Sequence, residues 1–299
     1  MQICSFLPSA TETLYALGLG DSVAGVTFEC DFPPEAGTKN IVVNTQLGHE
    51  LTSAEIDHRV NDNPSHGESL YRADIRKLEA IKPDLIVTQE LCDVCAIGTS
   101  YVAKAIHQLS SQPEVLSLTP HTLEDVLEDV LNIGKATHRD AEASELVSSL
   151  RERIAKVGQM TKTKRPRVAC LEWLSPPFNG GHWIPEMIEM AGGVDPLGEI
   201  GKDSYRMEWD QVLRADPEVV LVMPCGHDLQ RSIQEYRGTQ FPEEWKQVSA
   251  VRNGRVYAVN ANAYFSRPGP RLVTGLEIMY SLLQEDRPQE PAADSWRLL

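Results

Sequence analysis

The stretch that decides the fold is 137–163, which reads THRDAEASELVSSLRERIAKVGQMTKT and predicts one long helix near the middle of the chain. Its apolar side chains recur every three or four residues and form a single stripe: Ala143, Leu146, Val147, Leu150, Ile154 and Val157. Thr137 and Asp140 have the spacing of a capping box, and Pro166 would stop the helix. At 1.5 Å per residue the helix would be about 35–40 Å long. On its own, the stretch fits either an ordinary amphipathic core helix or a connector between two halves of the chain.

The sequence on the two sides of this helix has matching features, which favours the connector. KPDLIVTQ at 82–89 resembles DPEVVLVM at 216–223, and a short predicted helix precedes each. Strands and helices alternate in both halves, a pattern that implies parallel sheets with right-handed crossovers. We therefore expect an α/β fold class with two Rossmann-like lobes joined by a single long linking helix, and a ligand cleft between the lobes. The expected divisions are an N-terminal α/β lobe at 1–136, the linking helix at 137–163 and a C-terminal α/β lobe at 164–299.

Composition and charge narrow the classes of partner. Of the 299 residues, 41% are hydrophobic and 24% are charged, which suffices for a well-formed core, and the formal net charge is −15. Such acidity disfavours nucleic acid and anionic membrane surfaces as partners. No apolar run approaches the ~20 residues of a membrane span, so we expect no membrane insertion. The expected oligomeric state is a monomer.

The start of the chain resembles a strand rather than a leader peptide, because residues 2–7 read QICSFL. The sequence as written therefore predicts a cytoplasmic location. The alternative is a periplasmic location after removal of a leader.

The six cysteines fall into two groups, and we expect all of them as reduced thiols. Cys4 and Cys170 lie inside strand-like apolar runs and are expected as small core residues. Cys92 and Cys95 form a C-x-x-C pair with three possible interpretations. They can be half of a metal site that Cys30, Cys225, His182 or His227 completes, a redox pair at the start of a helix, or two small loop residues.

Polar, thiol and aromatic side chains collect in the loops that follow the predicted strands, where ligands of open α/β sheets bind. The expected ligand-binding residues are Glu29, Cys30, Gln89, Cys92, Cys95, Phe178, His182, Trp183, Cys225, His227, Tyr264, Phe265 and Arg267. Aromatic rings among them can line a flat apolar site, and Arg267 can bond an anionic ligand edge. Possible metal ligands are Cys92, Cys95, Cys225 and His182. The chain has no nucleophile elbow, Walker loop, dinucleotide fingerprint or HExxH motif, so we expect a binding protein and not an enzyme.

Short motifs spread in order along nearly the whole chain resemble the class III substrate-binding proteins of ABC importers for cobalamin, haem and iron chelates. They are LPSATE at 7–12, GVT at 25–27, DFPP at 31–34, KPDLIV at 82–87, PPF at 176–178, AGG at 191–193, and Phe265, Arg267, Pro270 and Arg271. The cobalamin-binding branch of this family is similar at TQELCDVC, GGHW and MPCG, which occupy 88–95, 180–183 and 223–226. The resemblance implies two lobes with a linking helix, a chelate held between them, and a membrane permease as partner.

The chain departs from the periplasmic cobalamin binders at three positions. Gln46 and Gln89 stand where those proteins have aromatic rings, and Ala263 stands where they have an acid, beside Tyr264. Two hypotheses follow. In the first, the chain binds a corrinoid or related metal chelate and has no certain cofactor of its own. In the second, it is a cytosolic metal-binding or thiol-redox protein that uses its cysteine and histidine residues on the same scaffold.

Overall fold

The computed structural model describes residues 1–45, 71–89, 106–160, 164–284 and 294–299. It separates into two compact units. The N-terminal unit contains the described residues of 1–120 and 124–149, and the C-terminal unit contains 121–123 and the described residues of 150–299. The run His121–Leu123 therefore belongs to the C-terminal unit, although its neighbours in sequence belong to the N-terminal unit.

A six-stranded sheet forms the centre of the N-terminal unit, in the order β4-β3-β2-β1-β5-β6. All neighbouring pairs are parallel except β3 and β4, which are antiparallel at one edge. The strands are β1 (Ile3–Ser5), β2 (Val23–Thr27), β3 (Asn40–Thr45), β4 (Tyr71–Ala73), β5 (Leu85–Gln89) and β6 (Glu114–Leu118). The central strands β1 and β5 are buried along their whole length because helices cover both faces, which explains their continuous apolar sequence.

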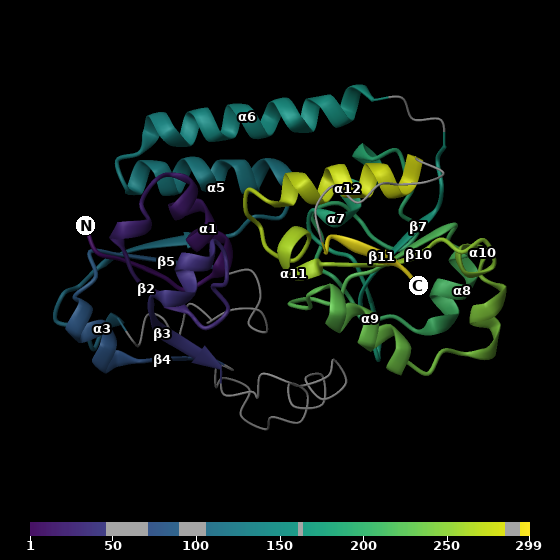
Figure 1. Ribbon diagram of the computed structural model, residues 1–299, viewed down its shortest axis with the longest axis horizontal. Coiled ribbons are helices and arrows are strands. Elements are labelled where there is room, and N and C mark those ends of the chain that lie inside the picture. Colours follow the sequence, from purple (N-terminus) through teal and green to yellow (C-terminus); the bar gives the residue numbers. More distant parts are fainter. Residues whose placement is uncertain (46–70, 90–105, 161–163, 285–293) are drawn as a thin grey trace. The chain divides into compact units, whose positions relative to one another are not determined.

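Helices α1 (Pro8–Ala16) and α5 (Leu123–Ala136) lie over one face of this sheet, and α3 (Ile75–Ile81) lies over the other (Figure 1). Pro8 opens α1, at a position where the missing N–H of proline leaves no helix hydrogen bond unmade. Asp74 caps α3 by accepting a hydrogen bond from the backbone N–H of Lys77 at 3.1 Å. Cys4 is fully buried in the core below α3, as expected, and burial raises the pKa of its thiol to about 12.

The C-terminal unit has a five-stranded sheet in the order β11-β10-β9-β7-β8. Its three inner strands are parallel, and the two outer strands pair antiparallel with their neighbours. The strands are β7 (Val168–Leu174), β8 (Pro177–Asn179), β9 (Val219–Val222), β10 (Val256–Val259) and β11 (Trp296–Leu298). The two similar stretches at 82–89 and 216–223 thus contain β5 and β9, which are inner strands of the two sheets.

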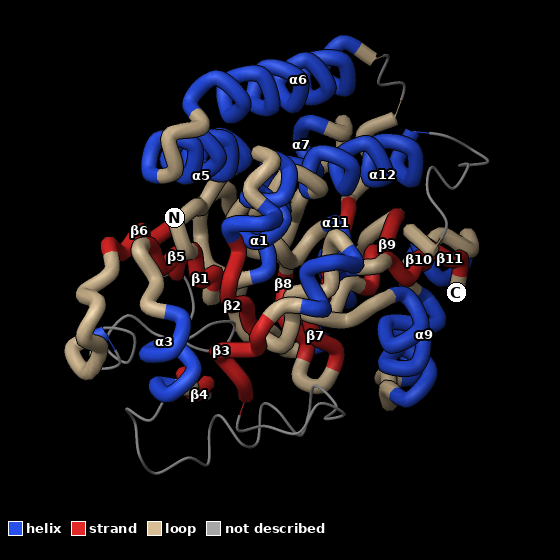
Figure 2. Tube along the Cα trace, turned by 60° about the vertical axis from the view of Figure 1, so that its left-hand side comes forward, coloured by secondary structure: helices blue, strands red, loops and turns tan. Residues whose placement is uncertain are grey.

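Two layers of helices enclose this sheet, as Figures 1 and 2 show from two directions. One layer contains α7 (Ile184–Met190) and α12 (Leu272–Gln284). The other contains α8 (Trp209–Ala215), α9 (Leu229–Gly238) and α10 (Ser249–Arg252), whose apolar side chains pack on alternate residues of β7, β9 and β10. The short helix α11 (Ala261–Tyr264) joins β10 to α12. Two α/β units on mainly parallel sheets are what the sequence predicts, and this fold class is confirmed.

The long helix expected at 137–163 is present as α6 (Asp140–Gln159). Its start differs from the expectation because His138 has a left-handed backbone, with φ of 56°, which separates α5 from α6. The Thr137 hydroxyl donates to the carbonyl oxygen of Ile133 at 2.7 Å, so it closes α5 and does not cap α6. The division between the two units falls inside α6, between Ser149 and Leu150, while the boundaries at 136 and 163 stay predictions. In the C-terminal unit, the Arg153 guanidinium of α6 holds both carboxylate oxygens of Glu277 on α12, at 2.9 and 2.7 Å.

Two short strands complete the edges of the C-terminal sheet. The segment after β7 contains β8, which folds back on β7 through a hairpin. Trp296–Leu298 forms β11 on the other edge. Helix α9 follows β9 and begins at an Asp228 cap that accepts from the Arg231 N–H at 2.8 Å.

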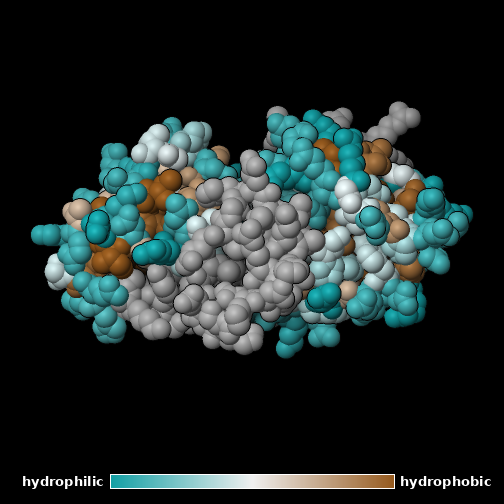
Figure 3. All heavy atoms as spheres, turned by 90° about the horizontal axis from the view of Figure 1, so that it is seen from below, coloured by the Kyte–Doolittle hydropathy of each residue, from teal (hydrophilic) through white to brown (hydrophobic). Residues whose placement is uncertain are grey.

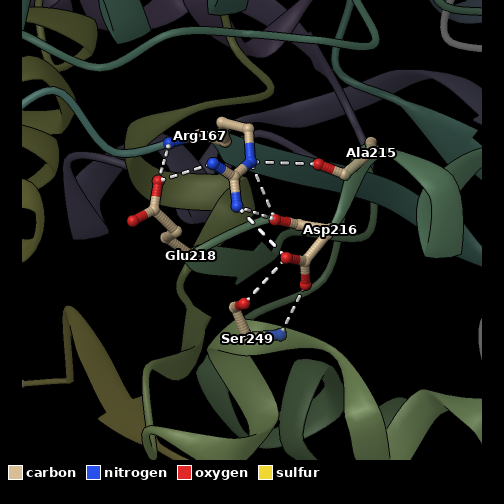
Figure 4. Close-up of polar contacts among 5 residues, drawn as sticks. All are labelled: Arg167, Ala215, Asp216, Glu218 and Ser249. Atoms are coloured by element: carbon tan, nitrogen blue, oxygen red, sulfur yellow. Dashed lines mark hydrogen bonds and ion pairs between the residues drawn. The ribbon is translucent and has the colours of Figure 1, made fainter.

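Polar contacts around Arg167, just before β7, connect the segment before β7 with the segment before β9 and with the start of α10 (Figure 4). The guanidinium donates to the backbone oxygens of Ala215 and Asp216, and it lies 3.2 Å from the Asp216 carboxylate and 3.3 Å from the Glu218 carboxylate. Asp216 also accepts from the backbone N–H and the hydroxyl of Ser249, both at 2.8 Å. These bonds fix the turn before β9 and the start of α10.

We expect Asp216→Ala to lower the free energy of unfolding by about 1–2 kcal/mol, the usual cost of a lost helix cap. The hydrogen bonds from Ser249, aided by Arg167, lower the pKa of the Asp216 carboxyl. This stabilisation is therefore complete above the ordinary aspartate pKa of about 4 and is lost as the pH falls through the lower folded-state pKa. Urea denaturation at pH 7 and at pH 3 should give a smaller difference between wild type and variant at pH 3. An equal difference at both pH values would contradict the role of the charge. Asp216→Asn, which keeps one acceptor and tolerates the left-handed backbone, should lose less stability.

The visible face in Figure 3 is mostly hydrophilic outside the grey atoms, and hydrophilic side chains break up its hydrophobic areas. None of the helices in the described ranges has the length and apolar character that a membrane span requires.

Candidate functional site

In the N-terminal unit, three of the expected site residues lie at the carboxyl ends of β2 and β5. Glu29 and Cys30 follow β2, and Gln89 is the last residue of β5 and is buried. Cys30 is 4% exposed, and its sulfur lies 3.0 Å from the hydroxyl oxygen of Thr11 on α1. The Cys30 thiol is thus packed against α1 within this unit. Cys92 and Cys95 lie outside the described residues, so the three interpretations of their pair stay predictions.

In the C-terminal unit, the carboxyl ends of β9 and β10 carry five of the expected residues. Cys225 and His227 follow β9, while Tyr264, Phe265 and Arg267 follow β10. The two loops are joined because the Asn262 N–H donates to the carbonyl oxygen of His227 at 2.9 Å. Cys225 and Tyr264 are partly exposed, whereas His227 and Phe265 are buried and Arg267 is 9% exposed. The sheet therefore brings a thiol, an imidazole, a phenol and a guanidinium to one edge.

His227 is a neutral imidazole at pH 7. Burial lowers its pKa to about 4, and the positive charge of Arg231 acts in the same direction while Asp228 opposes it. Its Nδ1 atom is buried and has no hydrogen-bond partner among the described residues. A neutral ring nitrogen of this kind can accept a hydrogen bond or bind a metal without first losing a proton.

Trp183 and Phe265 form the packed base of this edge. The Trp183 indole N–H donates to the carbonyl oxygen of Phe265 at 2.9 Å, and both side chains are almost fully buried. Gly275 of α12 lies directly against the Tyr264 carbonyl oxygen, with no room for a Cβ atom. Close approach of α12 to α11 therefore depends on the missing side chain at Gly275.

Phe178 lies apart from this group, on the edge strand β8, where its ring packs against Trp173 with 6.1 Å between centroids. It is half-buried. Among the expected aromatic residues, Phe178 thus belongs to a strand-to-strand pair at the edge of the sheet.

His182 has two neighbours that the sequence did not indicate, His121 and Asp203. The His121 and His182 rings stack with centroids 5.6 Å apart, and His182 Nε2 lies 3.2 Å from Asp203 Oδ1. Burial lowers the pKa of His182, the Asp203 charge opposes this, and His121 adds to the lowering. These residues come from three separate parts of the chain, so no local motif could have predicted the group. Cys225, the metal ligand expected beside His182, is not part of the cluster that the described residues form there.

Comparison with known proteins places the chain in a family. The model of the periplasmic binding protein family matches residues 3–263. An ABC transporter substrate-binding lipoprotein of Bacillus subtilis is 25% identical over 95% of this chain and 80% of its own length. The vitamin B12-binding protein of Vibrio cholerae is 22% identical over 95% of this chain and 89% of its own length. The crystal structure of a periplasmic heme-binding protein from Pseudomonas aeruginosa has a TM-score of 0.72 and 14% identity, and covers 97% of this chain and 95% of its own.

The cytoplasmic location that the sequence predicted is wrong. The relatives include a lipoprotein and periplasmic proteins, which points to an extracytoplasmic location. The strand-like reading of residues 2–7 is correct, since Ile3–Ser5 forms β1, but it carries no information about the compartment.

Family members bind small molecules for import and are not enzymes, in agreement with the expected class of function. The resemblance to ABC-importer proteins that the sequence motifs suggested is therefore confirmed. With a match over most of its length and two units of the predicted architecture, the chain belongs to the periplasmic binding protein family of ABC-importer substrate-binding proteins.

Proposed function

We propose that this chain binds a corrinoid and delivers it to the permease of an ABC importer. The observation that carries the proposal is the similarity to the vitamin B12-binding protein of Vibrio cholerae, which extends over 95% of the chain. The substrate-binding lipoprotein of Bacillus subtilis supports the importer context. We infer binding without catalysis.

The carboxyl edge of the C-terminal sheet has the chemistry that a large, flat and partly polar ligand requires. Tyr264 offers a half-buried aromatic ring, and the Arg271 guanidinium lies 5.9 Å from its centroid. Because ligands of open parallel sheets bind beyond the carboxyl ends of the strands, this edge is where we place corrin contacts. Stacking a corrin face on an aromatic ring removes apolar area from water, a gain of about 25 cal/mol per Å² before association losses.

His227 and Cys225 extend the polar part of the proposed site. The neutral His227 ring adds no positive charge beside a metal chelate at pH 7, and its low pKa keeps it neutral down to about pH 5. A corrin carries amide side chains, so neutral donors and acceptors suit its rim better than fixed charges. The alternative of a cytosolic thiol-redox protein is not favoured, because the family consists of extracytoplasmic binding proteins.

We expect cobalamin to bind with a dissociation constant of about 1 μM or below. Titration followed by the visible absorption of the corrin would measure the affinity, with haem and a ferric chelate as competing ligands. Tyr264→Ala should weaken cobalamin binding by about tenfold, the typical effect of removing an aromatic contact. The matched control is Tyr205→Ala, since Tyr205 is 44% exposed and its hydroxyl donates to the Leu197 carbonyl oxygen, outside the loops that follow β9 and β10.

Binding of haem or the ferric chelate in preference to cobalamin would overturn the corrinoid proposal while leaving the importer context intact. Equal losses in the Tyr264 and Tyr205 variants would contradict the placement of the site. Circular dichroism of both variants distinguishes a lost contact from a lost fold.

A further inference from the structure

We propose that His121, His182 and Asp203 form a binding site for a divalent transition-metal ion, with Zn²⁺ as the ion that suits it best. One nitrogen or oxygen atom from each residue lies within 4.8 Å of the atoms from the other two. All three residues belong to the C-terminal unit. The site is distinct from the proposed corrinoid contacts, and its test does not depend on them.

The spacing of the pair formed by His182 and Asp203 matches metal coordination. Two ligands held at about 2.0–2.2 Å from a tetrahedral Zn²⁺ lie about 3.3–3.5 Å from each other. His182 Nε2 and Asp203 Oδ1 are 3.2 Å apart. The ligand atoms of all three residues lie within 4.8 Å of one another, so a small side-chain movement within a rotamer well brings the His121 nitrogen into the same range.

The same pair has the distance of a hydrogen bond but not its alignment. His182 Nε2 is buried and makes no hydrogen bond within the described residues, although the carboxylate oxygen lies at ion-pair distance. A ring nitrogen in an ordinary histidine–aspartate pair would point its proton at the oxygen. Two ligands of one ion instead direct their lone pairs at a shared third point, so a close nitrogen–oxygen contact without hydrogen-bond alignment is compatible with a shared ion.

Backbone contacts hold two of the three side chains in place. The His182 N–H donates to the Lys202 carbonyl oxygen at 2.6 Å, and the Gly201 N–H donates to the His182 carbonyl oxygen at 2.9 Å. Gly181 lies against the backbone nitrogen of Ser204, in a space that no Cβ atom could enter. The chain segment with Asp203 is thereby fixed next to His182, as a metal site requires.

The third ligand is positioned by the start of α5. The Leu123 N–H donates to a carboxylate oxygen of Glu186 on α7 at 2.8 Å, which fixes the short run that begins with His121. The stacked rings of His121 and His182, with planes 28° apart, keep the two imidazole edges side by side.

Two imidazoles and a carboxylate favour Zn²⁺, Co²⁺ or Ni²⁺ over Mg²⁺ and Ca²⁺, which prefer oxygen ligands. Three protein ligands leave a coordination position for water, and the 77% exposed Asp203 side chain gives the ion a path from solvent.

The experiment measures Zn²⁺ binding to the full chain after treatment with a chelator, by competition with a chromophoric indicator. We expect one Zn²⁺ per chain. His182→Asn, whose side chain tolerates the left-handed backbone at φ of 55°, should weaken binding by at least about 100-fold, and Asp203→Asn by at least about tenfold. His107→Ala, a solvent-exposed histidine outside the cluster, is the matched control and should bind as wild type does.

Co²⁺ substitution identifies the ligands spectroscopically. The proposal predicts visible d–d bands without the intense near-ultraviolet charge-transfer band of a thiolate, and an unchanged spectrum in the Cys92→Ser, Cys95→Ser double variant. Loss of Zn²⁺ in that double variant would overturn the proposal. So would binding that survives in both the His182 and Asp203 variants, or a wild type that binds no Zn²⁺. Thermal unfolding of the metal-free variants checks that each remains folded.

Discussion

Gly275→Ala is expected to destabilise the protein by about 1–3 kcal/mol, the range for overpacking a close-packed interior. The new methyl group would collide with the Tyr264 carbonyl oxygen, which is backbone and cannot rotate away. Either α11 or α12 must then shift, and Tyr264 and Phe265 shift with α11. Urea denaturation measures the loss of stability, and cobalamin titration should give a weaker affinity because the displaced residues belong to the proposed site.

Gly158→Ala is the matched control for this substitution. Gly158 also lies in a helix, α6, but nothing lies within 4 Å of a Cβ atom there. Alanine at this exposed position should stabilise the protein by about 0.5–1 kcal/mol, because glycine is a poor helix former. A loss of stability in Gly275→Ala together with a gain in Gly158→Ala would establish the close contact between α11 and α12. A Gly275→Ala protein as stable as wild type would mean that α11 and α12 are not packed as described.

Trp183→Ala should have the largest effect of any single substitution considered, about 3–5 kcal/mol of lost stability. The side chain is 4% exposed, donates to the Phe265 carbonyl oxygen and packs against the His182 ring with 5.5 Å between centroids. Its removal leaves a large cavity and an unpaired carbonyl group. Equilibrium unfolding in urea, followed by circular dichroism, measures the effect.

Trp183→Phe separates the cost of the cavity from the cost of the lost hydrogen bond. The phenyl ring fills most of the space but cannot donate, so the expected loss falls to about 1–3 kcal/mol, the cost of leaving the Phe265 carbonyl oxygen unsatisfied plus a smaller cavity. If Trp183→Ala costs less than about 1 kcal/mol, the indole does not form the base of the carboxyl edge.

Much of the fold could be predicted from the sequence because the signals are local. Val23–Thr27 and Leu85–Gln89 are short apolar runs between turn residues, and they form inner strands as such runs do. Asp74 precedes a helix and caps it. The repeated strand motif at 82–89 and 216–223 predicted two similar units, because each copy forms an inner strand of its own sheet.

Elements that depend on pairing partners could not be predicted in the same way. β8 contains only Pro177–Asn179, and Trp296–Leu298 follows a proline-rich acidic stretch, so neither has a periodic pattern. Both become strands because an exposed edge of the sheet offers backbone hydrogen bonds to them. The predicted start of α6 was wrong because the helix break before it is a left-handed backbone at His138. Such a backbone usually occurs at glycine, and no glycine marks it in the sequence.

The residues of the candidate site could largely be selected from the sequence, but which of them lie together in space could not. Strand ends indicated Cys225, His227, Tyr264 and Arg267, and these residues do lie at neighbouring loops of one sheet. His182 was also selected, yet its neighbours are distant in sequence: His121 follows β6 of the other sheet, and Asp203 lies between α7 and α8. Their proximity arises from hydrogen bonds between distant segments, such as the one from Leu123 to Glu186, which no spacing in the sequence reveals.

The membership of His121–Leu123 in the C-terminal unit has a practical consequence for anyone who wishes to cut the protein in two. A fragment that begins at Leu150 would lack the backbone donor for Glu186 and one imidazole of the histidine pair, although it would include every strand of its own sheet. No single cleavage point yields two complete halves. Separately expressed pieces should therefore regain their Zn²⁺ affinity only when mixed, whereas a fragment extended back to His121 would carry all three ligands by itself.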